Sequence, residues 1–115
     1  MSFLKGVKDE VLVNVRVEVT GDLGKKIIVP FKARYKRLPI NEAKVLVDNV
    51  RADIMTDEQL IQEVLLGWQD MPGPTGEDVK FSQEALDEAM SVMGYRKALV
   101  EGFINQQFEI ETKNR

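Results

Sequence analysis

The chain has 115 residues, of which 43% are hydrophobic and 30% charged, and its formal net charge is −3. These values are ordinary for a single globular domain over residues 1–115 and exclude wholesale disorder. The sequence has no cysteine and no histidine, which excludes disulfides, most zinc sites and Ser-His or Cys-His catalysis. The composition therefore favours binding over chemistry, with no cofactor and no metal expected.

Neither a membrane span nor a secretory signal is predicted. No apolar run approaches the roughly 20 residues that cross a bilayer. The opening residues MSFLKGVKDEVLV lack the continuous apolar stretch and small-residue cleavage site of a signal peptide. We therefore expect a cytoplasmic protein.

Charge divides the chain into two unlike parts. Residues 1–40 hold nine Lys/Arg and four Asp/Glu, giving +5, whereas residues 41–115 hold seven against fifteen, giving −8. Opposite charges can attract within one molecule or between copies. Two solvated faces of different sign are the simpler interpretation.

The first predicted element is an antiparallel β-hairpin over residues 11–37. VLVNVRVEV at residues 11–19 places valines at every second position, and TGDLGK follows as a turn. The second strand alternates in the same way from Ile27 to Tyr35. Pro30 cannot donate a ladder hydrogen bond, which predicts an edge position there.

Residues 41–110 are predicted to form a helical part. Asn41 is the expected first N-cap, and the apolar face of that helix is Ala43, Leu46, Val47, Val50 and Ile54. TDEQ at Thr56 forms a capping box, and the apolar stripe of the second helix runs on to Trp68.

The third and fourth helices complete this part. Ser82 is the expected cap of the third, its stripe ends at Met93, Gly94 interrupts it, and the fourth spans about 95–108. Residues 111–115 are expected to fray. The predicted fold is α+β: an antiparallel hairpin packed on a bundle of about four short helices.

The segment between Trp68 and Phe81 carries two prolines and three acidic residues: Asp70, Glu77 and Asp78. Their spacing does not match a calcium loop, and Pro72 and Pro74 do not make a PxxP ligand. The segment is interpreted as a spacer whose ends, Trp68 and Phe81, fix the angle between the second and third helices.

Two candidate surfaces remain. The polar face of the hairpin is basic, through Arg16, Lys32, Arg34 and Lys36, and Arg37 lies just beyond it. It suits nucleic acid or an acidic protein, although edge strands also carry lysines to discourage aggregation. Apolar client or self contacts are assigned to Trp68, Phe81, Met90, Met93, Leu99 and Phe103, with ordinary core packing as the alternative.

In order, several pieces resemble the tail assembly chaperones of long-tailed bacteriophages. They are FKARYKRLPINEA at 31–43, DEQLIQEVLLGWQDM at 57–71, VKFSQEAL at 79–86, YRKALVEGFINQ at 95–106 and the terminal TKN. The chain departs from the family pattern in its longer, proline-bearing loop at 71–76.

The resemblance implies a non-enzymatic protein of the host cytoplasm that is absent from the mature virion. It would bind the tape measure protein, keep it soluble and promote tail tube assembly, and it would self-associate. A frameshifted, extended form would contact the major tail protein. A nucleic-acid-binding or regulatory protein using the basic hairpin face is the alternative, and an enzyme working through carboxylates alone is third.

Overall fold

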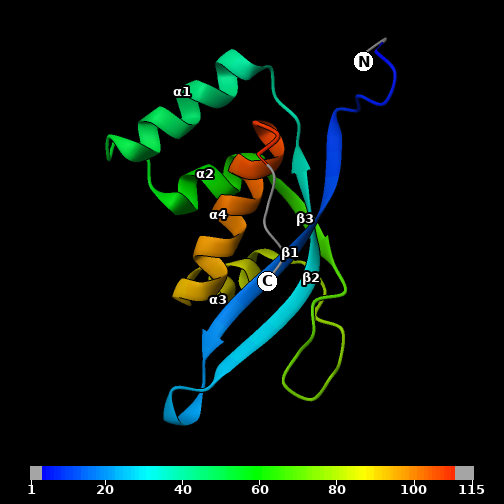
Figure 1. Cartoon of the computed structure of the whole chain (residues 1–115), viewed down its shortest axis with the longest axis vertical. Coiled ribbons are helices and arrows are strands. Elements are labelled where there is room, and N and C mark those ends of the chain that lie inside the picture. Colours follow the sequence, from blue (N-terminus) through cyan, green and yellow to red (C-terminus); the bar gives the residue numbers. More distant parts are fainter. Residues whose placement is uncertain (1–3, 111–115) are drawn as a thin grey trace.

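The computed structural model describes residues 4–110, which form an α+β fold, as the sequence predicts (Figure 1). The frayed tail expected at 111–115 lies outside these residues. The elements in chain order are β1 (Glu10–Thr20), the 3₁₀ turn η1 (Asp22–Gly24), β2 (Lys26–Lys36), α1 (Ile40–Arg51), α2 (Asp57–Val64), β3 (Leu65–Gln69), α3 (Gln83–Met90) and α4 (Met93–Gln107). Within the described range, no helix has the length and apolar character needed to cross a membrane.

The strands form an antiparallel sheet in the order β1-β2-β3. The hairpin prediction is confirmed, but the sequence does not predict β3: the apolar stripe expected for the second helix runs on to Trp68, through residues that form this strand. A short apolar run such as LLGW fits either structure by periodicity, and pairing with β2 decides for the strand. Trp68 therefore lies opposite Ala33 in the sheet, not at a helix end. Pro30 lies beyond the β3 pairing, so its position is a local edge of the sheet.

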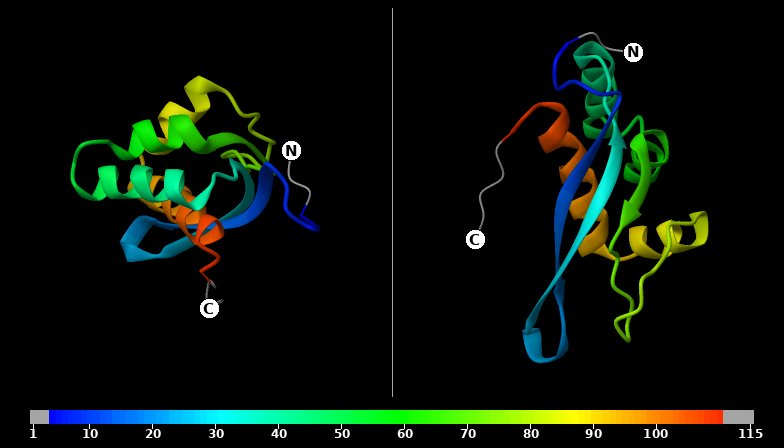
Figure 2. Two further views of the ribbon diagram at one scale, coloured as in Figure 1. Left: turned by 90° about the horizontal axis from the view of Figure 1, so that it is seen from above. Right: turned by 90° about the vertical axis from the view of Figure 1, so that its right-hand side faces the viewer.

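The helices lie on one face of the sheet, and the hairpin extends past them (Figure 1, Figure 2). We call residues 18–29 the hairpin arm: its base, at Glu18 and Val29, lies beside the helices, and the rest projects past them. At its tip, Leu23 has a positive φ of 58° and a fully exposed side chain. The molecule measures 47 Å along its longest axis because the arm adds to the length of the packed part.

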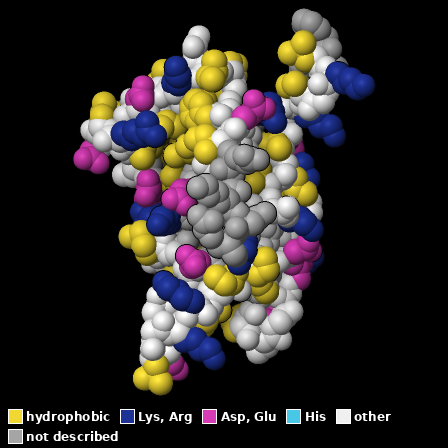
Figure 3. Space-filling view, in the orientation of Figure 1, with side chains coloured by type: hydrophobic (Ala, Val, Ile, Leu, Met, Phe, Trp, Pro, Cys, Tyr) yellow, Lys and Arg dark blue, Asp and Glu magenta, His cyan; other side chains and the backbone are white. Residues whose placement is uncertain are grey.

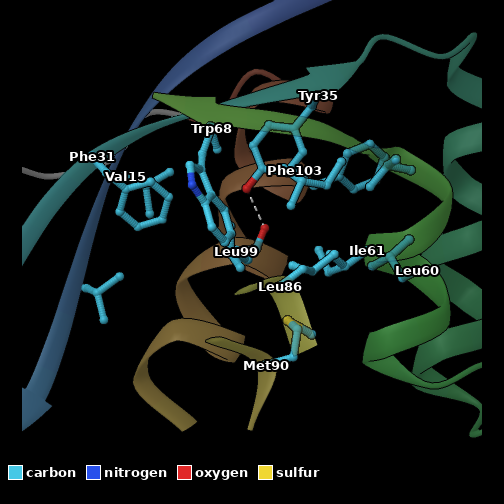
Figure 4. Close-up of a cluster of buried hydrophobic side chains, with 14 of the residues drawn as sticks. Val15, Phe31, Tyr35, Leu60, Ile61, Trp68, Leu86, Met90, Leu99 and Phe103 are labelled. Carbon is cyan, nitrogen blue, oxygen red and sulfur yellow. Dashed lines mark hydrogen bonds between the residues drawn. The ribbon is translucent and has the colours of Figure 1, made fainter. Parts of the chain in front are cut away.

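The core occupies the other end of the sheet, where α4 crosses its inner face (Figure 4). Tyr35, Leu99 and Phe103 are all completely buried. The Tyr35 hydroxyl donates a 2.6 Å hydrogen bond to the Leu99 carbonyl oxygen, so its polar tip is satisfied inside the core. Gly102 permits the close approach, because a Cβ at this position would lie 2.6 Å from the Tyr35 hydroxyl oxygen.

Helix α1 begins two residues earlier in the chain than predicted. Its N-cap is Pro39 rather than Asn41, and the Pro39 carbonyl accepts from Ala43 N at 3.1 Å. Proline lacks an N–H and suits the start of a helix, where that group has no helical partner. The helix ends at Arg51, so Ile54 leaves the predicted apolar face and is 73% exposed.

The predicted caps of the next two helices are confirmed. The Thr56 hydroxyl accepts from Gln59 N at 3.1 Å, and the Gln59 side chain accepts from Thr56 N, which completes the capping box. The Ser82 hydroxyl accepts from Ala85 N at 3.0 Å. Each cap depends only on residues three apart, which is why the sequence reveals them.

The break between α3 and α4 falls at Ser91 and Val92, not at Gly94. Gly94 lies in the first turn of α4, and Met93 is the first residue of that helix rather than the end of the α3 stripe. Gly94 serves packing: a Cβ there would collide with the Glu18 carbonyl oxygen of β1. Because glycine has no Cβ, α4 can rest directly on the strand.

Candidate functional site

An apolar groove of about 450 Å³ lies where the hairpin arm, the loop after β3 and the α3–α4 turn meet. Its walls come from segments far apart in the sequence: Val29 on the arm; Trp68, Met71, Pro72, Gly73, Pro74 and Val79 around the loop; and Ala85, Glu88, Ala89, Val92 and Tyr95 on the helices. Its size is that of a binding pocket, which commonly spans roughly 300–1,000 Å³.

A row of aromatic side chains supports the inner end of the groove. Trp68 packs edge-on against Phe81 with centroids 4.9 Å apart and against Phe31 at 6.2 Å. Phe31 in turn stacks on Tyr95 of α4 at 6.3 Å. Phe81 and Trp68 thus do bracket the loop, as predicted, although Trp68 does so from a strand. Such contacts make a rigid apolar base.

The loop is a preformed wall, where the sequence suggested only a spacer. Val79 N donates to the Met71 carbonyl at 2.8 Å and Gly73 N to the Glu77 carbonyl at 2.7 Å, closing the loop on itself. The Trp68 indole N–H donates to the Val79 carbonyl at 2.8 Å and fixes the base. The two prolines restrict the chain between these bonds.

Glu77 orders the tip of this loop. Its carboxylate accepts from Thr75 N at 2.8 Å and from the Thr75 hydroxyl at 2.9 Å. Hydrogen bonds from its own backbone N–H and from Thr75 hold the pKa of Glu77 below its usual value. The side chain lies against Gly73, where a Cβ would overlap the carboxylate. A negative charge therefore sits beside the loop wall at neutral pH.

One wall of the groove is formed by one face of α3 and by the turn that follows this helix. Ala85, Ala89 and Val92 recur at the spacing that puts side chains on one side of a helix. Val92 is 39% exposed and is the N-cap of α4, without a side-chain capping hydrogen bond. An apolar N-cap forgoes about 1 kcal/mol available to Ser, Thr or Asp. Unfavourable local choices of this kind are typical of functional positions.

The residues predicted for a partner surface differ in how far the structure buries them. Met90, Leu99 and Phe103 are buried in the core at 4%, 0% and 0% exposure, which corrects their assignment to a surface. Their apolar spacing indicates a buried face but does not say what covers it. Met93 is 72% exposed, and Trp68 is 8% exposed with an edge in the groove.

The basic hairpin face lies on the side of the sheet away from the helices. Lys32 pairs with Asp70 at 2.9 Å, and Arg34 approaches Glu10 at 3.7 Å. Arg34 and Lys36, both proposed for partner contacts, are partly buried. The acids of the chain thus offset part of the positive charge on this face, which lowers its attraction for phosphates.

A second hollow, of about 480 Å³, lies between the end of α1 and α2 and contains Glu58 and Glu63. Arg96 donates two hydrogen bonds to the Glu58 carboxylate, and this lowers the Glu58 pKa. A carboxylate held ionised in an ion pair is a poor proton shuttle at neutral pH. Over residues 4–110 there is no group of three or more acidic side chains able to hold a metal ion.

Comparison with protein-family models, with curated protein sequences and with solved structures found no match. The groove was not predicted from the sequence. Its available signals were Val92, an apolar residue between two helices, and the alanines at 85 and 89, which leave room on that face of α3.

Proposed function

We propose that this protein is a phage tail assembly chaperone that binds the tape measure protein, keeps it soluble and promotes tail tube assembly without catalysis. Two independent arguments support the proposal. One is the resemblance of the ordered segments between residues 31 and 114 to that family. The other is the apolar groove, which is the observation that carries the proposal on physical grounds.

The groove suits the apolar face of an amphipathic helix. Helix-in-groove recognition uses a few apolar anchors at i, i+3, i+4 and i+7, which insert into a hydrophobic depression. Small molecules instead require several convergent polar groups for orientation. Among the described residues that line this groove, Glu88 is the one charged side chain, and the Trp68 N–H already donates to Val79.

Binding of this kind protects a long helical client until the tail tube forms around it. Each buried apolar anchor contributes on the order of 1.5–3 kcal/mol, so a few anchors give reversible binding that polymerising tube protein can displace. Self-association of the chaperone, and contact of an extended form with the major tail protein, belong to the same proposal.

Co-expression with the tape measure protein of the same phage tests the proposal. We expect the client to move from the insoluble to the soluble fraction and to co-purify with the chaperone. Ala89→Arg places a long cation in the groove and should abolish this effect. Val45→Arg is the matched control, because Val45 is 58% exposed on α1, away from the groove.

Two results would contradict the proposal. A client that stays insoluble and unbound beside well-expressed chaperone would remove the chaperone function. Equal solubilisation by the wild type and the Ala89→Arg variant would remove the groove as its site. Circular dichroism of both variants verifies that each one is folded before the comparison is made.

A further inference from the structure

Acidic residues flank the apolar groove on two sides, in the loop after β3 and on helix α3. Residues 71–92 contain five acidic residues, Glu77, Asp78, Glu84, Asp87 and Glu88, against the single basic residue Lys80. These acids belong to the loop and to α3, which supply most of the groove lining. Asp70, which precedes this segment, already pairs with Lys32 on the other face of the sheet.

The acids are placed to act on a ligand in the groove. Glu88 lines the groove itself, and Glu84 precedes it by one helical turn, so the two carboxylates lie on the same side of α3. The Glu77 carboxylate lies against Gly73 in the opposite wall. Hydrogen bonds keep the Glu77 carboxylate ionised at neutral pH, because they lower its pKa. From the hairpin arm, only the apolar Val29 reaches the lining.

We infer that the groove takes a basic amphipathic helix: a client segment whose apolar anchors are flanked by lysines or arginines. The inference rests on the proposed function, since it assigns the segment to the client. Apolar contact with the base supplies most of the affinity, and the acidic rim selects the charge of the partner and speeds its encounter. A helix flanked by acids meets like charges on both walls.

Two synthetic peptides of about 18 residues test this selection. Both carry leucines at i, i+3, i+4 and i+7; one has lysines at the flanking positions and the other glutamates. Trp68 is the only tryptophan of the chain and lines the groove, so its emission reports occupancy directly. With the full chain at low salt, we expect the lysine peptide to bind at least tenfold more tightly, and the preference to shrink at high salt.

A charge-reversed variant tests the rim. Glu84→Lys combined with Glu88→Lys should remove the preference for the lysine peptide or reverse it. Glu42→Lys combined with Asp48→Lys is the matched control: it changes the net charge equally, on exposed positions of α1, and also replaces one acid in a first helical turn. The control should bind both peptides as the wild type does.

Each contrary outcome separates this inference from the proposed function. Equal binding of the two peptides, or an unchanged preference in the Glu84→Lys and Glu88→Lys variant, overturns the basic-helix inference and leaves the chaperone proposal intact. The same conclusion follows if neither peptide alters Trp68 emission while the client is still solubilised. If the lysine peptide binds but the client stays insoluble, the proposed function fails instead.

A second copy of the chain is the rival occupant, because the tip of the hairpin arm joins exposed apolar and basic side chains (Figure 3): Leu23, Lys25, Lys26 and Ile27. In that case Trp68 emission would depend on protein concentration alone, light scattering would show oligomers, and Leu23→Asp would abolish both effects. That result would overturn the basic-helix inference in favour of self-association.

Discussion

Val29 and Tyr35 lie on the same face of strand β2, yet one lines an open groove and the other is completely buried. At the Tyr35 end, α4 and its neighbours cover the sheet and close a core around Phe103. At the Val29 end, the strand runs past the helices and a loop stands beside it. The same alternation of apolar residues thus makes a core where it is covered and a candidate binding surface where it is not.

Truncation of a core side chain should have the largest effect on stability. Phe103→Ala is expected to lower the free energy of unfolding by about 3–5 kcal/mol, because it removes a fully buried ring and leaves a cavity. Met93→Ala, at a position 72% exposed, should change it by less than about 0.5 kcal/mol. Urea denaturation of the two variants measures the contrast, and equal losses would contradict the assignment of Phe103 to the core and of Met93 to the surface.

Gly94→Ala tests the contact that seats α4 on β1. Alanine favours a helix over glycine by about 1 kcal/mol, but its Cβ would collide with the Glu18 carbonyl oxygen. We expect the collision to prevail, with a net loss of about 1–3 kcal/mol in thermal and urea unfolding. A stabilised variant would show that α4 does not rest on the strand in this way.

Tyr35→Phe should cost about 1–2 kcal/mol at pH 7, because the Leu99 carbonyl loses its buried donor. Burial raises the pKa of the Tyr35 hydroxyl above its usual value. The folded protein therefore resists the ionisation that the unfolded chain undergoes near pH 10, and stability falls as the pH rises above about 10. The difference between the wild type and the variant should shrink there, as urea titrations at pH 7 and pH 11 would reveal.

Val92→Ser is predicted to have a small effect on stability, of the opposite sign. Serine can accept a hydrogen bond at the N-cap of α4, where valine cannot, so the variant should gain about 0.5–1 kcal/mol. It should also weaken binding at the groove, because Val92 lines it. Thermal unfolding and titration with the lysine peptide give the two readings. A stabilised variant that binds the peptide unchanged would argue against a functional reason for the valine.

The sequence by itself determined the hairpin and the caps of two helices. The valines of β1 alternate over the whole strand, and the caps at Thr56 and Ser82 use partners three residues away. Such signals are local, so they survive without knowledge of the fold. The apolar spacing of Leu99 and Phe103 likewise indicated helix, although not that both side chains would be completely buried.

Only the tertiary structure decided the rest. Leu65 to Gln69 became a strand because β2 offered an unpaired edge, and no local pattern reports a partner thirty or more residues away in sequence. The loop became a wall because Trp68 and Met71 hold its carbonyl and amide groups at Val79. Whether an apolar face is core or groove depends on what lies over it, and that is a property of the packing, not of the periodicity.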